Sequence, residues 1–464
     1  MPIKIIVLVS LFGLLASHAD AGGIGVGWRG DGMGRYPDAE PSLEWAKDKN
    51  VLWVTPTENW SYATPAVGEQ RIFITAESTT LICLNKGDGK LLWQFDHEYK
   101  DLPPGDQKTR LVEAEKLHQR IGALKGQLKA LRRELGELEE SETKDDAKIA
   151  ELKLKIEKLE PPLAELEAQY KTMAEFHKPE TSPNCGYASA TPVTDGQRVW
   201  VVFGNSVAAC YDEDGGRRWI RIIDKPGKQG FGHSSSPLLV DDKFVIQMDD
   251  LVAYDAQTCK ELWRVAVDVM PGTPVQTRLG GESVIVAPSG HIVRARDGAL
   301  LAHVKTSSIV FNSPIVHDGV VYIGSNMKGD AVAVKLPDKA EPFEPEFLWT
   351  TTVVEGKHYY ASPVYHEGLL FTLAEFDGLS AIDAKSGELL YTRKLEISTA
   401  FPSITVAGDH VMVAGQGGKT YVLEPKRQFT EVARNELEFH RSSPVFDGTR
   451  MYVRARENVY CIGR

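Results

Sequence analysis

The sequence lacks the short motifs that mark several common classes of enzyme and metal site. It contains no Gly-x-Ser-x-Gly segment, which would indicate a hydrolase nucleophile, and no phosphate-binding P-loop. It contains no His-x-His or His-Glu-x-x-His pattern, so local spacing assigns no metal site. Cysteine is scarce, with five residues in 464 and no adjacent pair. The sequence therefore predicts no catalytic residue and no metal ligand.

Positive charge is not in excess. Lys and Arg number 53 against 64 Asp and Glu, which gives a formal net charge of −11. This balance disfavours a nucleic-acid partner, because binding to a phosphate backbone relies on basic side chains. A hydrophobic content of 42% is enough for a folded core.

Long hydrophobic runs are missing after the N-terminus. Lys4 precedes an apolar run over residues 5–15, and both Ser17-His18-Ala19 and Ala19-Asp20-Ala21 fit a small-x-small cleavage site. Residues 1–21 are therefore predicted to be a signal peptide rather than an anchor, since a spanning helix needs about 20 apolar residues. No Cys follows the run, so we expect an exported protein, periplasmic or extracellular, that is not a lipoprotein. No transmembrane segment is expected after cleavage.

One phrase recurs along the chain: a small residue and Pro, followed by an apolar strand. The copies are at Pro65, Pro192, Pro237, Pro274, Pro314, Pro363 and Pro444, and we align Ser403 with Pro in an eighth. Most recur at about 40-residue intervals, the period of four-stranded propeller blades. The copies at Pro274 and Ser403 break the spacing to the next strand, so blades four and seven are the least regular.

The second half of most repeats is a hairpin with an Asx residue and, about eight residues later, an aromatic ring. Four pairs follow this pattern: Asn85 with Trp93, Asp212 with Trp219, Asp255 with Trp263, and Asp383 with Tyr391. The Asx side chain can cap the turn, and the ring can pack between neighbouring blades.

These hairpins resemble the tryptophan-docking motif of the PQQ-like propellers, Ala-x-Asp-x-x-x-Gly-x-x-x-Trp. That family includes quinoprotein alcohol dehydrogenases and the propeller lipoprotein of the outer-membrane β-barrel assembly machine, the BamB type. The resemblance covers nearly all of the chain outside the signal peptide and one insert. It implies an all-β fold and leaves the function open.

The two ends of the chain indicate how the ring of blades closes. The last repeat stops at Arg464 before its outer strand, and residues 50–54, which contain Trp53, look like that missing strand. The predicted fold is thus an eight-bladed β-propeller closed by an N-terminal strand. Cys83, Cys210 and Cys461 stand where other repeats have Ala, so together with Cys185 and Cys259 they are predicted to be free thiols.

One segment departs from the repeat. From Ala114 to Leu138 and from Ile149 to Met173, apolar residues alternate at spacings of three and four, which is a heptad pattern. It predicts an antiparallel coiled-coil hairpin inserted after blade one, with its second arm kinked or split at Pro161-Pro162. The seam is long enough to bury its own apolar stripe, so we expect the hairpin to be stable without contacts to the blades. The predicted divisions are a signal peptide (1–21), a closing strand with blade one (22–104), the hairpin (105–182), and blades two to eight (183–464).

The residues just before each inner strand should meet at the mouth of the central channel. They are Trp60, Tyr62, Tyr187, His233, Phe311, Asn312, Tyr359, Tyr360, Phe401, His440 and Arg441. Aromatic and polar groups at a concave mouth are the default hypothesis for a ligand site. The alternative is that each ring caps its own blade and plugs the channel. We expect the two histidines to be rim residues rather than metal ligands.

The most direct interpretation is a non-catalytic, exported scaffold with no cofactor, which binds a protein or polymer through its upper face and coiled-coil arm. Self-association through the arm and a role in envelope assembly are further options. The alternative is an oxidoreductase of the quinoprotein type that uses PQQ with Ca²⁺, or another metal. Those enzymes carry an adjacent Cys-Cys pair over the cofactor, which this sequence lacks.

Overall fold

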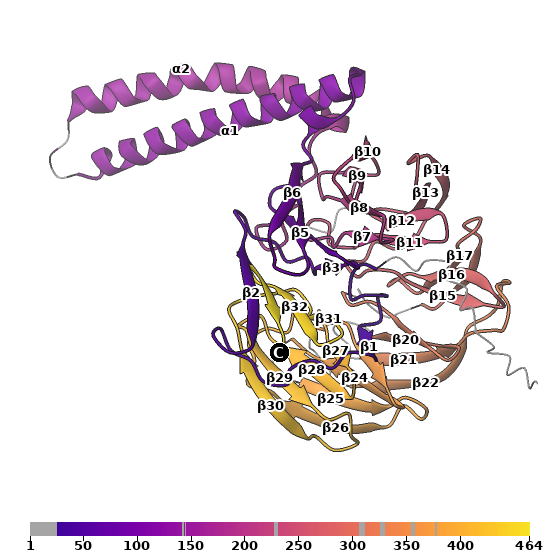
Figure 1. The fold of residues 1–464 in the computed structure, drawn as a ribbon. Helices are drawn as coiled ribbons and strands as arrows, with labels where there is room; N and C mark the ends of the chain where they lie inside the picture. The colour runs from indigo at the N-terminus through magenta and orange to yellow at the C-terminus, as the bar shows by residue number, and fades with distance from the viewer. Residues whose placement is uncertain are drawn as a thin grey trace, which may run out of the picture.

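The computed structural model describes residues 26–141, 143, 145–226, 231–305, 311–324, 330–353, 358–375 and 378–464. The predicted signal peptide lies outside these residues. In the part of the chain described, the backbone forms eight β-sheets and one long helical hairpin (Figure 1).

The first four sheets are antiparallel, and each uses four strands that follow one another in the chain. The first contains β3 (Ala66–Val67), β4 (Arg71–Ala76), β5 (Thr80–Asn85) and β6 (Leu91–Asp96). The second contains β7 (Val193–Thr194), β8 (Arg198–Val202), β9 (Val207–Asp212) and β10 (Arg217–Ile222). The third contains β11 (Leu238–Val240), β12 (Lys243–Gln247), β13 (Leu251–Asp255) and β14 (Glu261–Val265). The fourth contains β15 (Val275–Leu279), β16 (Glu282–Val286), β17 (His291–Arg294) and β18 (Leu300–His303).

The remaining sheets follow the same plan, and the N-terminal segment adds a strand to two of them. The fifth contains β19 (Ile315–His317), β20 (Val320–Gly324), β21 (Asp330–Lys335) and β22 (Glu346–Thr352). The sixth contains β23 (Val364–His366), β24 (Leu369–Leu373), β25 (Gly378–Asp383) and β26 (Leu389–Lys394). The seventh contains β27 (Thr405–Ala407), β28 (His410–Ala414), β29 (Lys419–Leu423) and β30 (Glu431–Glu436), with β1 (Arg35–Tyr36) at its inner edge. The eighth contains β31 (Val445–Asp447), β32 (Arg450–Arg454), β33 (Asn458–Ile462) and β2 (Val51–Pro56).

The hydrophobic core is divided among the junctions between successive sheets. The second and third strands of each sheet are buried on both faces, because a neighbouring sheet packs on each side; the outermost strand, such as β6, is largely exposed. The same packing joins the last sheet to the first, where Val445 and Tyr452 lie in one cluster with Ile72 and Ile74. Burial on both faces explains the apolar runs in the second and third strands.

The strand predicted near Trp53 pairs where the sequence places it. In the register of β2 with β33, Trp53 lies opposite Cys461 and Val54 opposite Tyr460. The eighth sheet therefore takes three strands from the C-terminus and one from the N-terminal segment.

The register that we assigned to the seventh repeat is wrong by one residue. The N–H of Ser403 donates to the Ser443 hydroxyl, and its own hydroxyl accepts from the N–H of Ser362, so Ser403 occupies the small-residue position of the phrase. Ile404 then stands where the other copies carry Pro. The buried strand residue Val411 follows Ile404 at the same spacing as Ile72 follows Pro65, so the apparent irregularity came from the alignment.

The insert between β6 and β7 is a pair of helices, α1 (Asp106–Glu139) and α2 (Asp146–Lys171), which extend away from the sheets (Figure 1). Short 3₁₀ turns, η1 (Tyr99–Asp101) and η2 (Ala174–Phe176), lie at its base. Seam residues Leu117, Ile121 and Leu166 are buried together, and ion pairs such as Lys125–Glu167 and Arg132–Glu160 cross between the helices. No helix in the described part of the chain is long and apolar enough to cross a bilayer.

Two expectations about this hairpin are corrected. Helix α2 runs through Pro161 and Pro162 without a break. Both prolines and the residues one turn earlier, Glu157 and Lys158, are exposed, so water can satisfy the carbonyls that lose a donor. The base of the hairpin also packs against the sheets, contrary to the prediction that the hairpin is stable without contacts to the blades.

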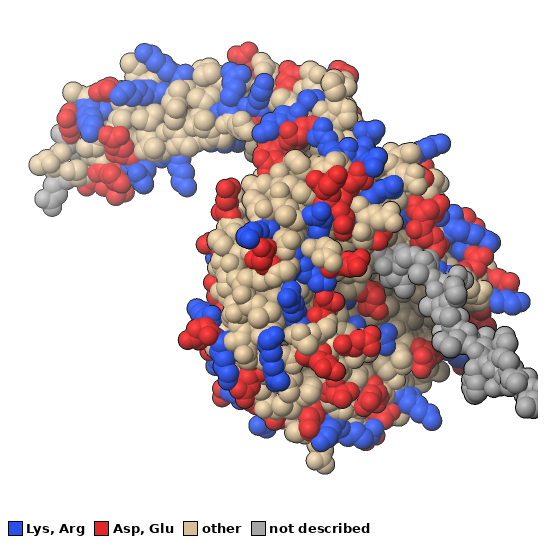
Figure 2. All heavy atoms as spheres, viewed as in Figure 1, with Lys and Arg blue, Asp and Glu red and all other residues tan. Residues whose placement is uncertain are grey.

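The contact that anchors the base is hydrophobic and is reinforced by one hydrogen bond. Leu102 and Leu111 are buried in a cluster with Phe203 of the second sheet. The hydroxyl of Tyr99 donates to the backbone oxygen of Asn205 at 3.0 Å. Figure 2 shows Lys, Arg, Asp and Glu side chains interspersed along the rest of the hairpin, as on a solvated surface.

All five cysteines are free in the structure. Cys83, Cys210 and Cys461 are buried in β5, β9 and β33, the third strands of their sheets. Cys259 occupies a left-handed turn position with φ of 59°.

Candidate functional site

A cavity of about 360 Å³ opens where the segments preceding the inner strands meet. We call it the mouth cavity. Its wall combines aromatic rings with small polar side chains. The lining residues are Tyr62, Ser182, Asn184, Cys185, Ser189, Phe231, Gly232, Ser234, Pro271, Phe311, Tyr360, Phe401 and Arg441. They come from most of the sheets and from the end of the helical insert, so this is the point at which distant parts of the chain converge.

Arg441 is the charged group of this wall, and aromatic rings enclose it. Its guanidinium carbon lies 4.1 Å from the ring centre of Phe401 and 4.4 Å from that of Tyr62. Cation–π contact of this kind favours the charged form in a site with little water. Burial lowers the pKa of Arg441, and nearby Tyr62 opposes that shift.

Two hydrogen bonds fix the orientation of Arg441. Nε donates to Oε1 of Gln416 at 3.0 Å, and one terminal nitrogen donates to the backbone oxygen of Asn184 at 2.9 Å. Among the described residues, the structure gives this arginine no carboxylate partner. A positioned and unneutralised guanidinium beside a cavity is suited to an anionic group, which it can bind bidentately.

The root of the helical hairpin forms one side of the mouth cavity. Ser182, Asn184 and Cys185 belong to the segment that returns from α2 to β7. Asn184 contacts Arg441 through its carbonyl, as described, and Cys185 Sγ lies 3.5 Å from the backbone oxygen of His233. Any movement of the hairpin root would therefore reach the cavity wall directly.

Below the mouth cavity lies a ring of hydroxyl groups, which we call the hydroxyl circuit. Each backbone N–H donates to the hydroxyl of the corresponding residue in the next sheet. In order, the donors and acceptors are Thr64, Thr191, Ser236, Thr273, Ser313, Ser362, Ser403 and Ser443, and the Ser443 N–H donates to Thr64. The circuit positions the start of every inner strand and hence the residues above it.

The N-terminal segment packs against the inner strands below the mouth cavity. Trp28 lines a second cavity of about 120 Å³, whose wall also contains the hydroxyl circuit. Next to it, Arg29 is fully buried and donates from one terminal nitrogen to the backbone oxygens of Pro363 and Ile404. Burial lowers the pKa of Arg29 to about 10. This packing could not be predicted from the sequence, because neither residue belongs to a repeat.

The structure brings together only part of the predicted mouth set. Tyr62, Tyr360 and Arg441 line the mouth cavity with Phe311 and Phe401. Trp60 packs against Tyr62, with ring centres 4.9 Å apart and planes inclined by 48°. The Tyr187 hydroxyl points away and donates to the backbone oxygen of Pro179.

The remaining four residues, which include Tyr359, are buried. His233 and His440 are buried, and neither Nε2 atom has a hydrogen-bond partner in the described structure, so they are not the rim residues that we expected. Asn312 is also buried, with its amide nitrogen 3.3 Å from the backbone oxygen of Tyr359. Each of the four buried residues is the direct chain neighbour of a residue that lines the cavity.

The predicted aromatic residues of the outer strands contact the next sheet. Each indole N–H of Trp93, Trp219 and Trp263 donates to a backbone carbonyl of the following repeat, on Glu213, Ala256 and Ala295 respectively. Trp349 makes the same contact with Ala384 in the fifth sheet. Trp349 was missed because residues between β21 and β22 lengthen that hairpin; the preceding Ala333 was the available signal.

The other residues predicted for the docking motif differ from this pattern. Trp53 packs over the turn at Gly89, but its indole nitrogen has no partner among the described residues. Tyr391 takes the ring position in the sixth sheet, 6.3 Å from Phe429. The side chains of Asn85, Asp255 and Asp383 accept from backbone N–H groups of their own turns, whereas Asp212 accepts from Arg218 instead.

The mouth cavity contains one thiol, that of Cys185, and its surroundings do not activate it. Burial raises the pKa of Cys185, so the thiol in the wall stays protonated and is a poor nucleophile. Its Sγ donates to Ser189 Oγ at 3.4 Å rather than contacting a base. The described lining residues include no carboxylate and no histidine. They offer a cation, hydroxyls and aromatic faces.

Comparison with known proteins identifies the repeat. The family described as outer membrane protein assembly factor BamB matches residues 43–153, 180–341 and 345–461. No curated protein sequence matches the chain. Several solved structures share the fold at low identity, so they inform on the fold alone.

Two of these structures are quinohemoprotein alcohol dehydrogenases. The enzyme from Comamonas testosteroni has a TM-score of 0.57 at 10% identity, with 92% of this chain and 78% of that chain covered. The enzyme ADHIIG from Pseudomonas putida HK5 has a TM-score of 0.56 at 12% identity, with the same coverage. BamB from Moraxella catarrhalis covers 58% of this chain and 80% of that chain, with a TM-score of 0.48 at 14% identity. Because the family match spans most of its length, this chain belongs to the BamB family of PQQ-like repeat propellers.

Proposed function

We propose that this protein is an exported, non-catalytic scaffold that binds a protein partner at the mouth cavity and along the helical hairpin. The observation that carries the proposal is Arg441, a positioned guanidinium in an aromatic setting with no carboxylate partner in the described structure. A partner that inserts a carboxylate, from an acidic side chain or a chain end, would complete its hydrogen bonding.

The scaffold is proposed to be a closed, eight-bladed propeller. Support comes from the eight sheets of the described residues and from the hydroxyl circuit, whose last hydrogen bond returns to its first member. The pairing of β2 with β33 is a second tie between the ends of the chain. Closure would hold the mouth residues rigid, which favours binding because little ordering is needed on association.

The hairpin is proposed to extend the binding surface. Its root shares the wall of the mouth cavity, and its distal part protrudes into solvent with charges of both signs (Figures 1 and 2). The heptad seam supports an antiparallel coiled coil, a shape that presents a long side for a partner or for a second copy of the chain.

An alternative role as a PQQ-dependent oxidoreductase is less well supported by the residues at hand. PQQ enzymes of this fold use Ca²⁺, a hard cation that takes oxygen ligands, usually including carboxylates. The described residues that line the mouth cavity provide hydroxyls and carbonyls but no Asp or Glu. This donor set does not fit a PQQ–calcium complex, and we derive no reaction through one.

We further propose that the protein works in the cell envelope. The description of its family names an outer-membrane assembly factor, and residues 1–21 have the pattern of a cleaved signal peptide. N-terminal sequencing of the protein from fractionated cells tests this part separately: a cytoplasmic protein that retains residue 1 would contradict it.

The binding proposal is tested by photo-crosslinking from the mouth. Phe231 lines the cavity and is 55% exposed, so a photoreactive amino acid at this position should form adducts with the bound partner. The expected result is an adduct in the parent protein that is lost with Arg441→Gln and at least partly retained with Arg441→Lys, which keeps the charge.

Arg434→Gln is the matched control. Arg434 lies 4.4 Å from the ring centre of Tyr421, but Glu431 and Glu396 already neutralise it. The Arg434→Gln variant should therefore give the same yield of adduct as the parent protein. Equal adducts from the parent and Arg441→Gln proteins would refute a role for Arg441, and turnover of an alcohol by the purified protein with PQQ and Ca²⁺ would refute the non-catalytic assignment.

A further inference from the structure

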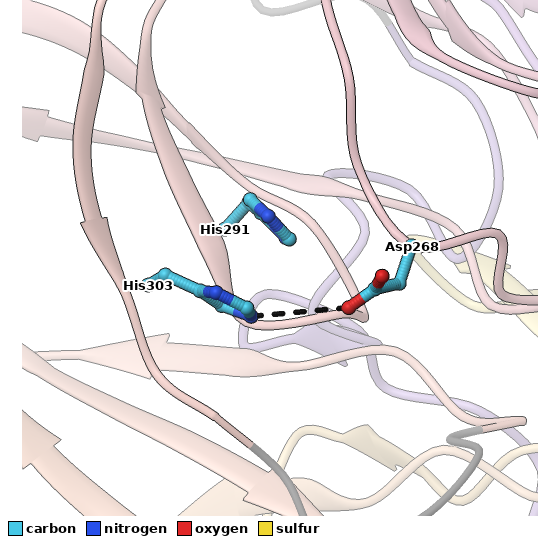
Figure 3. A group of neighbouring side chains, drawn as sticks. All are labelled: Asp268, His291 and His303. Atoms are coloured by element: carbon cyan, nitrogen blue, oxygen red, sulfur yellow. Dashed lines mark ion pairs between the residues drawn. The ribbon is translucent and has the colours of Figure 1, made fainter.

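Two histidines and one aspartate meet in the fourth sheet, away from any residue set that the sequence marked. His291 and His303 lie directly opposite each other on the antiparallel strands β17 and β18. Asp268 lies in the segment that leads from β14 to β15 and points toward the same place (Figure 3). The nitrogen and oxygen atoms that could bind a metal all lie within 4.8 Å of one another.

The two imidazole rings are held side by side. Their centres are 3.8 Å apart and their planes are inclined by 21°. Nδ1 of His291 lies 3.0 Å from the Ser289 hydroxyl, and the described structure gives its Nε2 no hydrogen-bond partner. A hydrogen bond at one ring nitrogen that orients the other is the usual arrangement around a histidine that binds a metal.

The third group completes an open arrangement. Oδ2 of Asp268 is 4.0 Å from Nε2 of His303, which also lies 3.2 Å from the backbone oxygen of Ser289. The Asp268 backbone is held by Gln247, whose side-chain nitrogen donates to its carbonyl at 3.2 Å. His291 is only 8% exposed, whereas the Asp268 side chain is 66% exposed. The buried imidazole thus forms the fixed side, and Asp268 has room to move inward.

The contact between the two rings disfavours a proton on both of them, because two charged imidazoles at this distance repel each other. The neutral imidazole is the form that donates a lone pair to a metal.

We propose that Asp268, His291 and His303 form a binding site for a divalent transition metal of the Zn²⁺ type. Two imidazole nitrogens and one carboxylate oxygen match the preference of such ions, whereas Ca²⁺ and Mg²⁺ prefer oxygen ligands alone. Zinc binds nitrogen and oxygen at about 2.0–2.2 Å, so the three ligand atoms, which lie within 4.8 Å of one another, must move closer together when the ion binds. A fourth position stays open for water or another ligand.

The proposed metal site is connected to the mouth cavity through the segment that contains Asp268. Asp268 shares its segment with Pro271, which lines the mouth, and the backbone oxygen of Pro271 accepts from Ser234, another lining residue. The metal proposal is independent of the proposed partner, because it concerns the isolated protein.

Titration of the purified protein, prepared without a polyhistidine tag, tests the site with Zn²⁺ and with Co²⁺ as a coloured substitute. One equivalent of Zn²⁺ should bind saturably, and Co²⁺ should give visible absorption that Zn²⁺ abolishes. His303→Gln and Asp268→Asn should each weaken Zn²⁺ binding by at least about tenfold, since both remove a ligand. Both side chains are partly exposed, so the variants should fold, and unchanged circular dichroism would verify this.

His317→Gln is the matched control. His317 stacks on Tyr365 at 3.8 Å and lies 3.3 Å from Asp318, but the described structure offers it no second imidazole. It should leave Zn²⁺ affinity unchanged. As a second readout, Zn²⁺ should raise the melting temperature of the parent protein and not that of Asp268→Asn. Absence of saturable binding, or equal affinity in the parent and both ligand variants, would overturn the proposal.

Discussion

The backbone N–H of Ser443 donates to the hydroxyl of Thr64 at 3.2 Å, although the two residues are 379 positions apart in the sequence. The contact joins the eighth repeat to the first with the same geometry that joins Thr64 to Thr191 within the chain. Because the same hydrogen bond is repeated at every junction of the hydroxyl circuit, the junction between the two ends of the chain should contribute as much to stability as the other junctions.

This equivalence gives the first prediction. Thr64→Val and Thr191→Val each remove one buried hydroxyl acceptor and leave one N–H unsatisfied, so each should lower the free energy of unfolding by about 1–3 kcal/mol. Urea unfolding measures both. If the ends of the chain were not joined in solution, Thr64→Val would cost much less than Thr191→Val, and the closed eight-bladed proposal would fail.

Much of this architecture is predictable because it repeats. The small residue and Pro recur before most of the inner strands, so one clear copy identifies the others. The outer strand that the last repeat lacks likewise identifies the strand near Trp53, which pairs with β33. The register of the seventh copy could not be settled the same way, because Ile404 replaces the Pro and a serine precedes it. The hydrogen bonds of Ser403 distinguish the two alignments, and the spacing from Ile404 to Val411 agrees with them.

The docking tryptophans provide a second test. Trp263→Phe removes an indole N–H that donates to the buried carbonyl of Ala295 at 2.8 Å, and should destabilise the protein by about 1–3 kcal/mol. Trp53→Phe is the paired variant, because the Trp53 indole nitrogen has no partner among the described residues. Its cost in the same unfolding experiment should be smaller; equal costs would mean that ring packing, not the hydrogen bond, sets the contribution.

Buried histidines predict the response to acid. His97 lies between the Thr79 carbonyl and the Tyr211 hydroxyl, and burial lowers its pKa from 6.5 to about 4. Between these values the unfolded chain binds a proton that the folded protein does not, so stability is full above pH 6.5 and falls as the pH drops toward 4.

His233 has a pKa lowered to about 4 for the same reason. Each residue should contribute up to about 1.4 kcal/mol per pH unit to the slope of unfolding free energy between pH 6.5 and 4. Chemical unfolding at several pH values should show a shallower slope in His97→Gln than in the parent. A slope that does not change would show that His97 is charged in the folded state.

The candidate sites were harder to predict than the fold. Arg441 could be placed at the mouth because it precedes an inner strand, but its lack of a carboxylate partner depends on side chains from several repeats. His291 and His303 come together only through the register of β17 and β18, and Asp268 only through the packing of two sheets. Trp28 and Arg29 lie among the inner strands, but they belong to a segment without a repeat, so no pattern in the sequence predicts their position.

The last prediction concerns the helical hairpin. Because Leu102 and Leu111 are buried against the second sheet, removal of the whole insert should damage the fold. A truncation that replaces residues 127–165 with a short Gly-Ser turn keeps this base and the cluster of Leu117, Ile121 and Leu166. It should leave the sheets intact, with the helical part of the circular dichroism signal reduced and the melting temperature nearly unchanged.

If the distal hairpin binds the partner, the truncated protein should also lose the adduct formed from Phe231, although the mouth cavity is preserved. If light scattering instead shows that the parent protein self-associates and the truncated form does not, the hairpin joins two copies of the chain. An adduct of unchanged yield and an unchanged mass would leave the mouth cavity alone as the binding site.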